Sequence, residues 1–404
     1  QHMPDKEQVK NDRGIHLPLC QCKKCGLIQF DCEPVEYYRD VIRAGGYSTT
    51  MVELRRRQYQ EFIKRYQLEG KKIIEAGCGR GEFLRVLKEF PVKGYGIEHD
   101  PSLAEIAKES GLLVSCDFTE TIDQKLPNGP FDAFLSFNFL EHQPSPDVML
   151  TCLYNNLTDD GVGLITVPSF EYITDHNTYY ELIHDHLAYY TFDSLTYLLN
   201  QNGFIVESKE MINRDTLSMV VRKTAMPEDG KMEQDDLAGL ERAASGVQTT
   251  SKCLEAETGA QKEHAEKTAK AQREDAADAG IITPLTDGYA VVTGEIRTLT
   301  ERLNREGRRL AMWGASHQGF TLASTSGLGE SLAYIIDSAP FKQGRFAPAS
   351  HVPIVAPDHY FEEPVDAVLI VAPGYTDEIA GIIRTKFGAG VEVMTLRTNR
   401  IEHL

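Results

Sequence analysis

A glycine-rich loop between a buried strand and a helix is the sequence feature that most constrains the fold. The apolar run 71–76 is typical of a short strand, the loop Gly77-Cys78-Gly79-Arg80-Gly81 follows it, and the stretch 82–90 has a helical pattern. Glycines at such a turn let the backbone approach a ligand closely, because a Cβ atom there would clash. The pattern predicts the first strand–turn–helix unit of an α/β sheet.

Strands and helices continue to alternate after this loop. Further strands are expected at 94–98, 112–116, 131–137, 161–167 and 217–221, with helices over 101–110 and 147–157. The alternation resumes late in the chain, with a helix over 291–305 and strands at 309–313, 332–337, 367–372 and 392–396. Alternation of this kind predicts a parallel sheet with helices on both faces. We therefore predict an α/β protein with a second, smaller α/β domain.

The segment between the two α/β regions has a different composition. Residues 225–280 are rich in Ala, Glu, Lys and Gln and nearly lack large apolar side chains. From Glu228 to Asp278 there are thirteen acidic and seven basic residues, so this segment carries a net charge of -6. We expect an exposed helical connector here, with a disordered one as the alternative.

The charge balance of the whole chain bears on its partners. The 404 residues include 42 Lys and Arg against 60 Asp and Glu, a formal net charge of -18. Nucleic-acid binding is driven by cationic side chains, so this balance argues against it, although a third of the net charge lies in the connector. No run approaches the roughly 18 apolar residues of a membrane span, and no signal peptide opens the chain. We expect no membrane association and a cytoplasmic location.

Four of the eight cysteines lie close together near the start of the chain: Cys20, Cys22, Cys25 and Cys32. The two-residue gap in Cys22-Lys-Lys-Cys25 lets both sulfur atoms face one tetrahedral zinc ion, with Gly26 able to take the tight turn. A structural zinc site usually has a second Cys-x-x-Cys, which is missing here. Cys20 and Cys32 are the candidates for the remaining ligands, and a vestigial knuckle with free thiols is the alternative.

The glycine loop departs from the fingerprint of dinucleotide-binding proteins. Gly-x-Gly-x-x-Gly needs its third glycine one residue after Gly81, where Glu82 stands. Glu75 precedes the loop, where a pyrophosphate would be repelled. Both features favour a cofactor with a positively charged end. S-adenosylmethionine (SAM) is such a cofactor, because it has an ammonium and a sulfonium group and no phosphate.

Acidic residues at the ends of the next two strands complete this cofactor hypothesis. Glu98 ends the second strand, where it can accept hydrogen bonds from both ribose hydroxyls. Asp117 ends the third strand and can accept a hydrogen bond from the adenine amine, with Phe118 beside the ring. The candidate cofactor-binding residues are Glu75, Gly77, Gly79, Gly81, Glu98, Asp117 and Phe118. The alternative is an α/β fold with incidental turn glycines.

At this point the chain resembles the class I SAM-dependent methyltransferases, and more closely the three-part C-methyltransferases that act on nucleotide-linked deoxysugars. The stretches that carry the resemblance are Cys22-Lys-Lys-Cys25-Gly-Leu-Ile-Gln29, Asn138-Phe-Leu-Glu-His142, His184-Asp-His186-Leu-Ala-Tyr-Tyr190, Gly314-Ala-Ser-His-Gln-Gly319 and Asp337-Ser-Ala-Pro-Phe-Lys342. The resemblance implies a Cys-rich zinc-knuckle-like region over 3–46, a Rossmann-like SAM domain over 47–223, the connector over 224–285 and a Rossmann-like substrate-binding domain over 286–404. It also adds Asn138 to the cofactor-binding residues.

The same resemblance implies a set of catalytic residues. Methylation of carbon needs a base that forms an enolate and a group that stabilises its oxygen. The resemblance places catalytic histidines at His142 and His186, and Asp185 stands where the family usually has Glu, to orient a histidine or hold the intermediate. Tyr47 is the candidate for a family tyrosine that follows the knuckle, whereas Ile183 replaces another. For each histidine the alternative is a capping or core role.

The C-terminal domain is implied to help hold the nucleotide-linked sugar. Ser316 and His317 lie on a strand-to-helix loop whose backbone N–H groups could cradle phosphate. Lys342 and Arg345 could add positive charge near a diphosphate. The alternative is a purely structural lobe.

The leading hypothesis is a SAM-dependent C-methyltransferase that acts, through a His-assisted enolate, on a nucleotide-linked keto sugar or a similar small anionic metabolite. One alternative is an O- or N-methyltransferase of another small molecule in natural-product biosynthesis, and another is a non-catalytic SAM-binding module. An NAD-dependent oxidoreductase is disfavoured, because the loop 314–319 lacks the middle glycine of the fingerprint.

Overall fold

The described chain divides into two compact units. The computed structural model describes residues 2–40, 49–225 and 282–404. Among these, the first unit holds 19–40, 49–170 and 185–225, and the second unit holds 2–18, 171–184 and 282–404. Nearly all of the expected connector, and the candidate Tyr47, lie outside the described residues.

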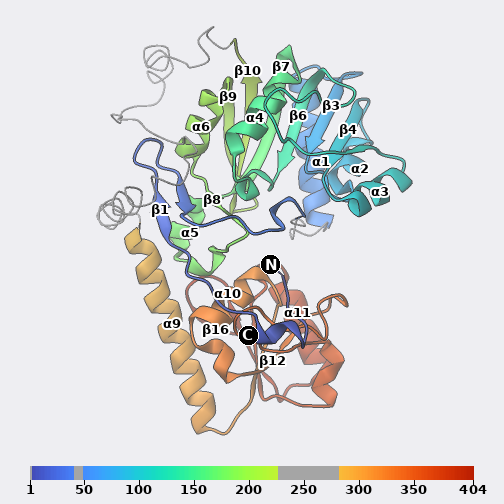
Figure 1. Ribbon diagram of the computed structural model, residues 1–404. Coiled ribbons are helices and arrows are strands. Elements are labelled where there is room, and N and C mark those ends of the chain that lie inside the picture. The colour runs from blue at the N-terminus through green and yellow to red at the C-terminus, as the bar shows by residue number, and fades with distance from the viewer. Residues whose placement is uncertain (1, 41–48, 226–281) are drawn as a thin grey trace. The chain divides into compact units, whose positions relative to one another are not determined.

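A seven-stranded sheet forms the centre of the first unit, in the order β5-β4-β3-β6-β7-β10-β9 (Figure 1). Its strands are β3 (Lys72–Ala76), β4 (Lys93–Glu98), β5 (Leu113–Cys116), β6 (Phe131–Phe137), β7 (Leu157–Pro168), β9 (Phe204–Ile212) and β10 (Thr216–Lys223). Strands β3 to β7 pair in parallel, whereas β10 is antiparallel to both β7 and β9. The predicted α/β class is confirmed, and the chain order reverses next to β3, where ligands of open α/β sheets bind.

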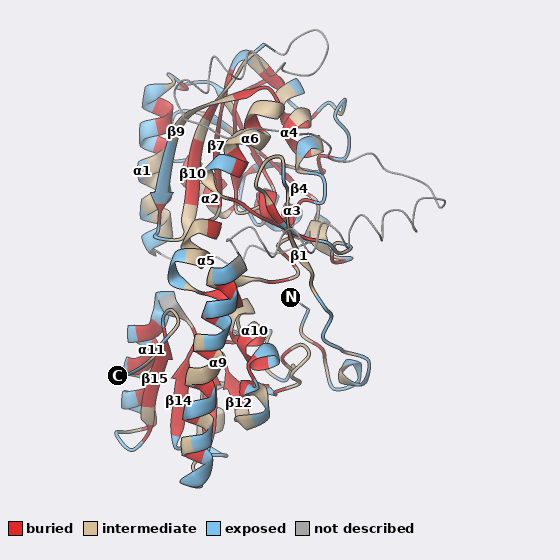
Figure 2. Ribbon diagram, turned by 90° about the vertical axis from the view of Figure 1, so that its left-hand side faces the viewer, coloured by how far each residue is buried: buried red, intermediate tan, exposed pale blue. Residues whose placement is uncertain are grey.

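Helices cover both faces of this sheet, as the alternation predicts. One face packs on α1 (Thr49–Arg65), α2 (Glu82–Leu87) and α3 (Pro101–Glu109), and the other on α4 (Pro146–Asn155) and α6 (Phe192–Gln201). Neighbouring strand residues alternate between these layers, since Ile73 packs with the first group of helices and Ile74 with the second. Figure 2 shows the strands largely buried, while α1 exposes its outer face.

Local sequence signals explain where several helices begin. Asp100 caps α3, because its side chain accepts hydrogen bonds from the backbone N–H groups of Ser102 and Leu103, and Pro101 occupies the first helical position. Thr191 and Ser194 form a capping box at the start of α6. The strand β9 was not predicted, because its middle is half-buried or exposed and lacks a run of buried apolar side chains.

The Cys-rich region forms part of a small antiparallel sheet. The strands β1 (Leu19–Gln21) and β2 (Ile28–Phe30) form a hairpin, and β2 pairs with β8 (Ala188–Tyr189). Strand β8 begins two residues after His186, in the same segment as Asp185. The hairpin therefore packs beside the segment that carries one of the candidate catalytic histidines.

The second unit contains a six-stranded sheet in the order β13-β12-β11-β14-β15-β16. Its strands are β11 (Leu310–Trp313), β12 (Leu332–Ile336), β13 (Ile354–Val355), β14 (Ala367–Ile370), β15 (Glu392–Leu396) and β16 (Ile401–His403), and only β16 among them runs antiparallel. One face packs on α9 (Ile282–Arg305) and α10 (His317–Thr325), the other on α11 (Thr376–Lys386). The helix expected from residue 291 begins at Ile282.

Two segments far from the C-terminal part in sequence belong to this second unit, which the sequence did not indicate. From residues 2–18, the carbonyl of Pro4 accepts a hydrogen bond from the Phe346 N–H, and Asp12 forms an ion pair with His351. From residues 171–184, which include most of α5 (Phe170–His176), the short helix Tyr179–Glu181 packs on α9 and α10. Among the described helices, none combines the length and the apolar character that crossing a membrane requires.

Candidate active site and cofactor pocket

The glycine loop after β3 has the tight geometry that its sequence predicts. Gly77, Gly79 and Gly81 all adopt positive φ angles, of 66°, 58° and 74°. A Cβ atom on Gly77 would lie 2.5 Å from the ring of Phe139, and one on Gly81 would lie 2.2 Å from Leu112 Cδ1. Glycine is therefore needed at these positions for both conformation and space.

Glu98 braces this loop from the end of β4. Its Oε2 atom accepts a hydrogen bond from the Gly79 N–H at 2.8 Å, and its Oε1 atom accepts one from the Asp100 N–H at 3.0 Å. Glu98 is 7% exposed, and burial raises its pKa although the two backbone N–H groups act in the opposite direction. Each carboxylate oxygen keeps a second lone pair with which to accept a ribose hydroxyl.

A small pocket lies at the carboxyl ends of β3 and β4. It is lined by Arg39, Gly77, Ile97, Glu98, His99, Asp117, Phe118, Thr119 and Phe139. Four of the predicted cofactor-binding residues thus line one hollow, where parallel α/β sheets bind ligands. Asp117 Oδ1 accepts hydrogen bonds from the Phe118 N–H and from Gln124 Nε2, both at 2.8 Å.

The remaining cofactor candidates lie near this pocket without lining it. Glu75 is fully buried within β3, and Gly79 and Gly81 lie on the loop itself. Asn138 follows β6 with a φ of 48°, its N–H donates to the Thr166 carbonyl oxygen at 2.8 Å, and its Oδ1 atom accepts from Thr166 Oγ1 at 3.2 Å. All of them belong to the carboxyl edge of the sheet.

Arg39 is a pocket residue that the sequence analysis did not identify. Its guanidinium group lies 5.2 Å from the centroid of the Phe118 ring, within cation–π distance. It also donates hydrogen bonds to Tyr38 Oη and Glu120 Oε1, both at 2.9 Å. No motif surrounds Arg39, so only the folded chain reveals it.

His142 and His186 lie together in the same unit. Their ring centroids are 4.8 Å apart at an angle of 70°. His142 lies in a 3-10 turn (Leu140–His142) after β6 and is 6% exposed, whereas His186 is half-buried. The His142 N–H donates to the carbonyl oxygen of Phe139, which links the histidine to a residue that lines the pocket.

The hydrogen bonding of His142 indicates the tautomer of its neutral ring. Nδ1 lies 2.6 Å from the backbone carbonyl oxygen of Asp185. A carbonyl can only accept, so Nδ1 carries the hydrogen in the neutral ring and Nε2 keeps a lone pair. Asp185, predicted to orient a histidine or hold the intermediate, contacts His142 through its backbone carbonyl, and the residue is 2% exposed. The role of its carboxylate stays a prediction.

Glu141 is a second residue of this cluster that sequence reasoning did not assign. It is 2% exposed, and its Oε1 atom lies 3.9 Å from His142 Nε2. One ligand-type atom from each of Glu141, His142 and His186 lies within 4.8 Å of the others. An acidic residue next to a candidate histidine, at the end of a buried strand, is the signal that could have identified it.

The cysteine hairpin has the turn expected of a knuckle. The Cys22 carbonyl accepts a hydrogen bond from the Gly26 N–H at 2.8 Å, and Gly26 has a φ of 72°. In the part of the chain that the structure describes, the four predicted ligands do not form a cluster as close as that of Glu141, His142 and His186. Burial, with the charges of Asp31 and Glu33, raises the pKa of Cys32, which disfavours its thiolate. Zinc at these cysteines stays a prediction.

Ser316 and His317 open α10 in the second unit. Ser316 Oγ accepts a hydrogen bond from the Gly319 N–H at 3.3 Å and so caps the helix. His317 Nε2 lies 3.1 Å from Glu181 Oε2. Both residues therefore belong to the strand-to-helix loop after β11, as the sequence indicated.

Lys342 is bound to the same loop through Asp337, which directly follows β12. Its Nζ atom lies 3.0 Å from Asp337 Oδ2 and donates to the Ala315 carbonyl oxygen at 2.8 Å, while Asp337 Oδ2 accepts from the Ala315 N–H at 3.0 Å. Asp337 after β12 thus holds the loop after β11, just as Glu98 of β4 holds the loop after β3 in the other unit. The positive charge of Lys342 is partly neutralised by this ion pair.

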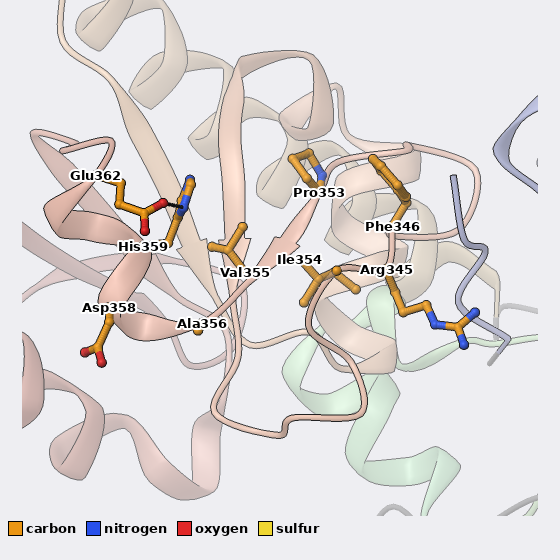
Figure 3. A pocket seen from close by; sticks show the side chains of 10 residues that line it. Arg345, Phe346, Pro353, Ile354, Val355, Ala356, Asp358, His359 and Glu362 are labelled. Atoms are coloured by element: carbon orange, nitrogen blue, oxygen red, sulfur yellow. Dashed lines mark hydrogen bonds and ion pairs between the residues drawn. The ribbon is translucent and has the colours of Figure 1, made fainter. Parts of the chain in front are cut away.

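Arg345 lines a pocket of about 390 Å³ in the second unit (Figure 3). Apolar side chains such as Phe346 and Ile354 form part of its wall, and His359 faces Glu362 at 3.2 Å on another side. Arg345 lies 3.8 Å from Asp5 in a weak ion pair. Ser316, His317 and Lys342 do not line this pocket, so the structure does not gather the four predicted substrate-binding residues around one hollow.

Comparisons with known proteins match both α/β regions. A family model described as a methyltransferase domain matches residues 51–209, and one described as a C-methyltransferase C-terminal domain matches residues 250–395. The C-methyltransferase NovU of Streptomyces niveus is 22% identical over 385 residues, which are 93% of this chain and 84% of that protein.

Solved structures of methyltransferases are also similar to this chain. The 1,6-didemethyltoxoflavin-N1-methyltransferase of Burkholderia thailandensis, with bound S-adenosylhomocysteine, is 18% identical, with a TM-score of 0.36 over 49% of this chain and 95% of that one. The magnesium protoporphyrin IX methyltransferase of Synechocystis PCC 6803, with bound SAM, is 13% identical, with a TM-score of 0.34 over 48% of this chain and 86% of that one.

Proposed function

The chain is a class I SAM-dependent methyltransferase that resembles the three-part C-methyltransferases, and we propose that it methylates a carbon atom next to the ketone of a nucleotide-linked sugar or a related small anionic metabolite. The observation that carries this proposal is the hydrogen bond from His142 Nδ1, which leaves a lone pair on Nε2. Its Nδ1 atom is held by a backbone carbonyl at 2.6 Å, so Nε2 can accept a proton. Methylation of carbon needs such a base to form an enolate, whereas methylation of oxygen or nitrogen needs no enolate.

The side chains that line the pocket at the ends of β3 and β4 suit the chemistry of SAM. Glu98 would offer lone pairs to the ribose hydroxyls, and Asp117 and Phe118 would lie beside the adenine, while Gly77 lets the loop pass the Phe139 ring. SAM, when bound, supplies an electrophilic methyl group. The residues of the chain then need to orient the acceptor and remove one proton from it.

His142 is the base in this proposal. Its Nε2 atom takes the proton from the acceptor carbon, and the C–H electron pair passes into the enolate. The hydrogen on Nδ1 stays bound to the nitrogen and is donated to the Asp185 carbonyl oxygen. His186 is half-buried beside it and is assigned to the enolate oxygen, where a hydrogen-bond donor stabilises negative charge. Tyr47 keeps its candidate role, and it lies outside the described residues.

The acceptor's diphosphate is assigned to the second unit. The N-terminus of α10, opened by Ser316 and His317, offers backbone N–H groups to an anion. Lys342 and Arg345 are the proposed cationic contacts, although each has a carboxylate partner in this structure. Thymidine and uridine diphosphate are suitable probes, and Lys342→Met should weaken their binding.

The test is hydrogen exchange in deuterated water, followed by NMR on a nucleotide-linked keto sugar without SAM. The wild-type chain should exchange the hydrogen next to the ketone, and His142→Asn should lose most of this exchange while it still binds SAM in calorimetry. Exchange at the wild-type rate in His142→Asn would exclude His142 as the base. Methyl transfer without any exchange would favour the O- or N-methyltransferase.

A further inference from the structure

A buried carboxylate lies beside the proposed base. Glu141 is 2% exposed and His142 is 6% exposed, and the Glu141 Oε1 and His142 Nε2 atoms are 3.9 Å apart. A carboxylate removed from water is costly unless donors or a positive charge compensate it. His142 and His186, each with a ring nitrogen within 4.8 Å of a Glu141 carboxylate oxygen, can provide that charge when protonated.

Hydrogen bonds tie the His142 side chain and the Glu141 backbone to one segment. The carbonyl oxygen of Asp185 accepts from His142 Nδ1, so the ring turns Nε2 towards Glu141. The carbonyl oxygen of Glu141 accepts a hydrogen bond from the Leu187 N–H at 2.9 Å. The 3-10 turn at Leu140–His142 and the segment before β8 therefore hold the base and the carboxylate in a fixed relation.

We propose that Glu141 is a positioning residue whose carboxylate stabilises the protonated imidazolium of His142 and so makes Nε2 a stronger base. Its effect on turnover rests on the proposed function, whereas its effect on the protonation of His142 does not. When Nε2 takes a proton, the positive charge forms 3.9 Å from a carboxylate oxygen, in surroundings that screen charge less than water does. The interaction therefore strengthens as the proton moves.

Other titratable groups surround His142, and their effects can be separated from that of Glu141. Asp185 and His186 lie on the segment before β8, and Tyr189 lies on β8 against His186. A protonated His186 would oppose a second positive charge on His142. Burial first, and then the charge of Glu141, raises the pKa of Tyr190, so that the carboxylate acts on more than one neighbour.

The test is an NMR titration of the His142 ring in the full chain, without SAM or acceptor. Glu141→Gln keeps the shape of the side chain and removes its charge, and His142→Asn identifies the signal. The matched control is Glu89→Gln, an exposed glutamate that pairs with Arg56. In Glu141→Gln the pKa of His142 should fall by about one unit or more, which is tenfold in proton affinity.

An unchanged pKa of His142 in Glu141→Gln, or an equal fall in Glu89→Gln, would overturn the proposal. Glu141→Asp retains the charge, so the pKa of His142 in this variant should stay close to that of the wild type. If the buried amide of Glu141→Gln prevents folding, Glu141→Asp keeps the proposal testable. With a methyl acceptor, the acidic limb of the kcat/KM profile should move to lower pH in Glu141→Gln, because the base is weaker. Failure to find any acceptor would refute the proposed function and leave the titration to decide the role of Glu141.

Discussion

Replacing Gly77 by alanine tests whether the glycine loop is shaped as the structure describes. Gly77 has a φ of 66°, a conformation that costs a residue with a Cβ atom about 1–2 kcal/mol. The new Cβ would lie 2.5 Å from the Phe139 ring, whereas carbon atoms pack best at about 3.5–4.0 Å. The ring must therefore move by about 1 Å, and such overpacking costs about 1–3 kcal/mol. We expect Gly77→Ala to lose about 2–5 kcal/mol of unfolding free energy.

Gly70→Ala is the matched control for this change. Gly70 has a φ of 72°, and a Cβ atom there would meet nothing within 4 Å, so it incurs only the conformational cost. Urea unfolding should place Gly77→Ala about 1–3 kcal/mol below Gly70→Ala. Calorimetry should also show a loss of SAM affinity in Gly77→Ala alone, because Phe139 and Gly77 both line the pocket. Equal stability of the two variants, with wild-type SAM affinity in both, would refute the reasoning.

Three further predictions concern the same unit. Asp100→Ala removes the cap of α3 and should cost about 1 kcal/mol in urea unfolding. The hydrogen bond from Ser102 lowers the pKa of Asp100 in the folded chain. The stabilisation by this cap is therefore present above the pKa of Asp100 in the unfolded chain and should vanish as the pH falls through its pKa in the folded chain. Burial raises the pKa of Glu98, so SAM affinity measured by calorimetry should begin to fall at a higher pH than an ordinary glutamate would give, and Glu98→Gln should abolish that pH dependence. Arg39→Ala removes the cation over Phe118 and should weaken SAM binding several-fold, and unchanged affinity would exclude Arg39 from the cofactor site.

The gathering of four strand-end residues at one edge of the sheet could be predicted from the sequence, because the carboxyl ends of parallel strands share one edge. Gly77, Glu98, Asp117 and Phe118 are separated by up to about 40 residues, yet the alternation of strands and helices predicts that they meet, and they line one pocket. Arg39 joins that pocket from outside the alternating pattern, so no local signal could identify it.

Contacts between distant segments set the limit of prediction elsewhere. The contact between the Asp185 carbonyl and His142 could not be predicted, because it depends on how the segment before β8 folds back on the end of β6. Residues 2–18 and 171–184 pack with the second unit. This could not be predicted, because their partners are distant in sequence and periodicity does not encode such contacts. The edge strand β9 was missed for a different reason, since its exposed middle lacks an apolar run.

The most direct test of the proposed C-methylation is to follow the methyl group itself. The full chain is incubated with SAM labelled with ¹³C in its methyl group and with a nucleotide-linked keto sugar, and the product is analysed by NMR. We predict a labelled methyl group bonded to the carbon next to the ketone, with His142→Asn giving little or no product. A labelled methyl group on oxygen or nitrogen, or full turnover by His142→Asn, would contradict the proposal.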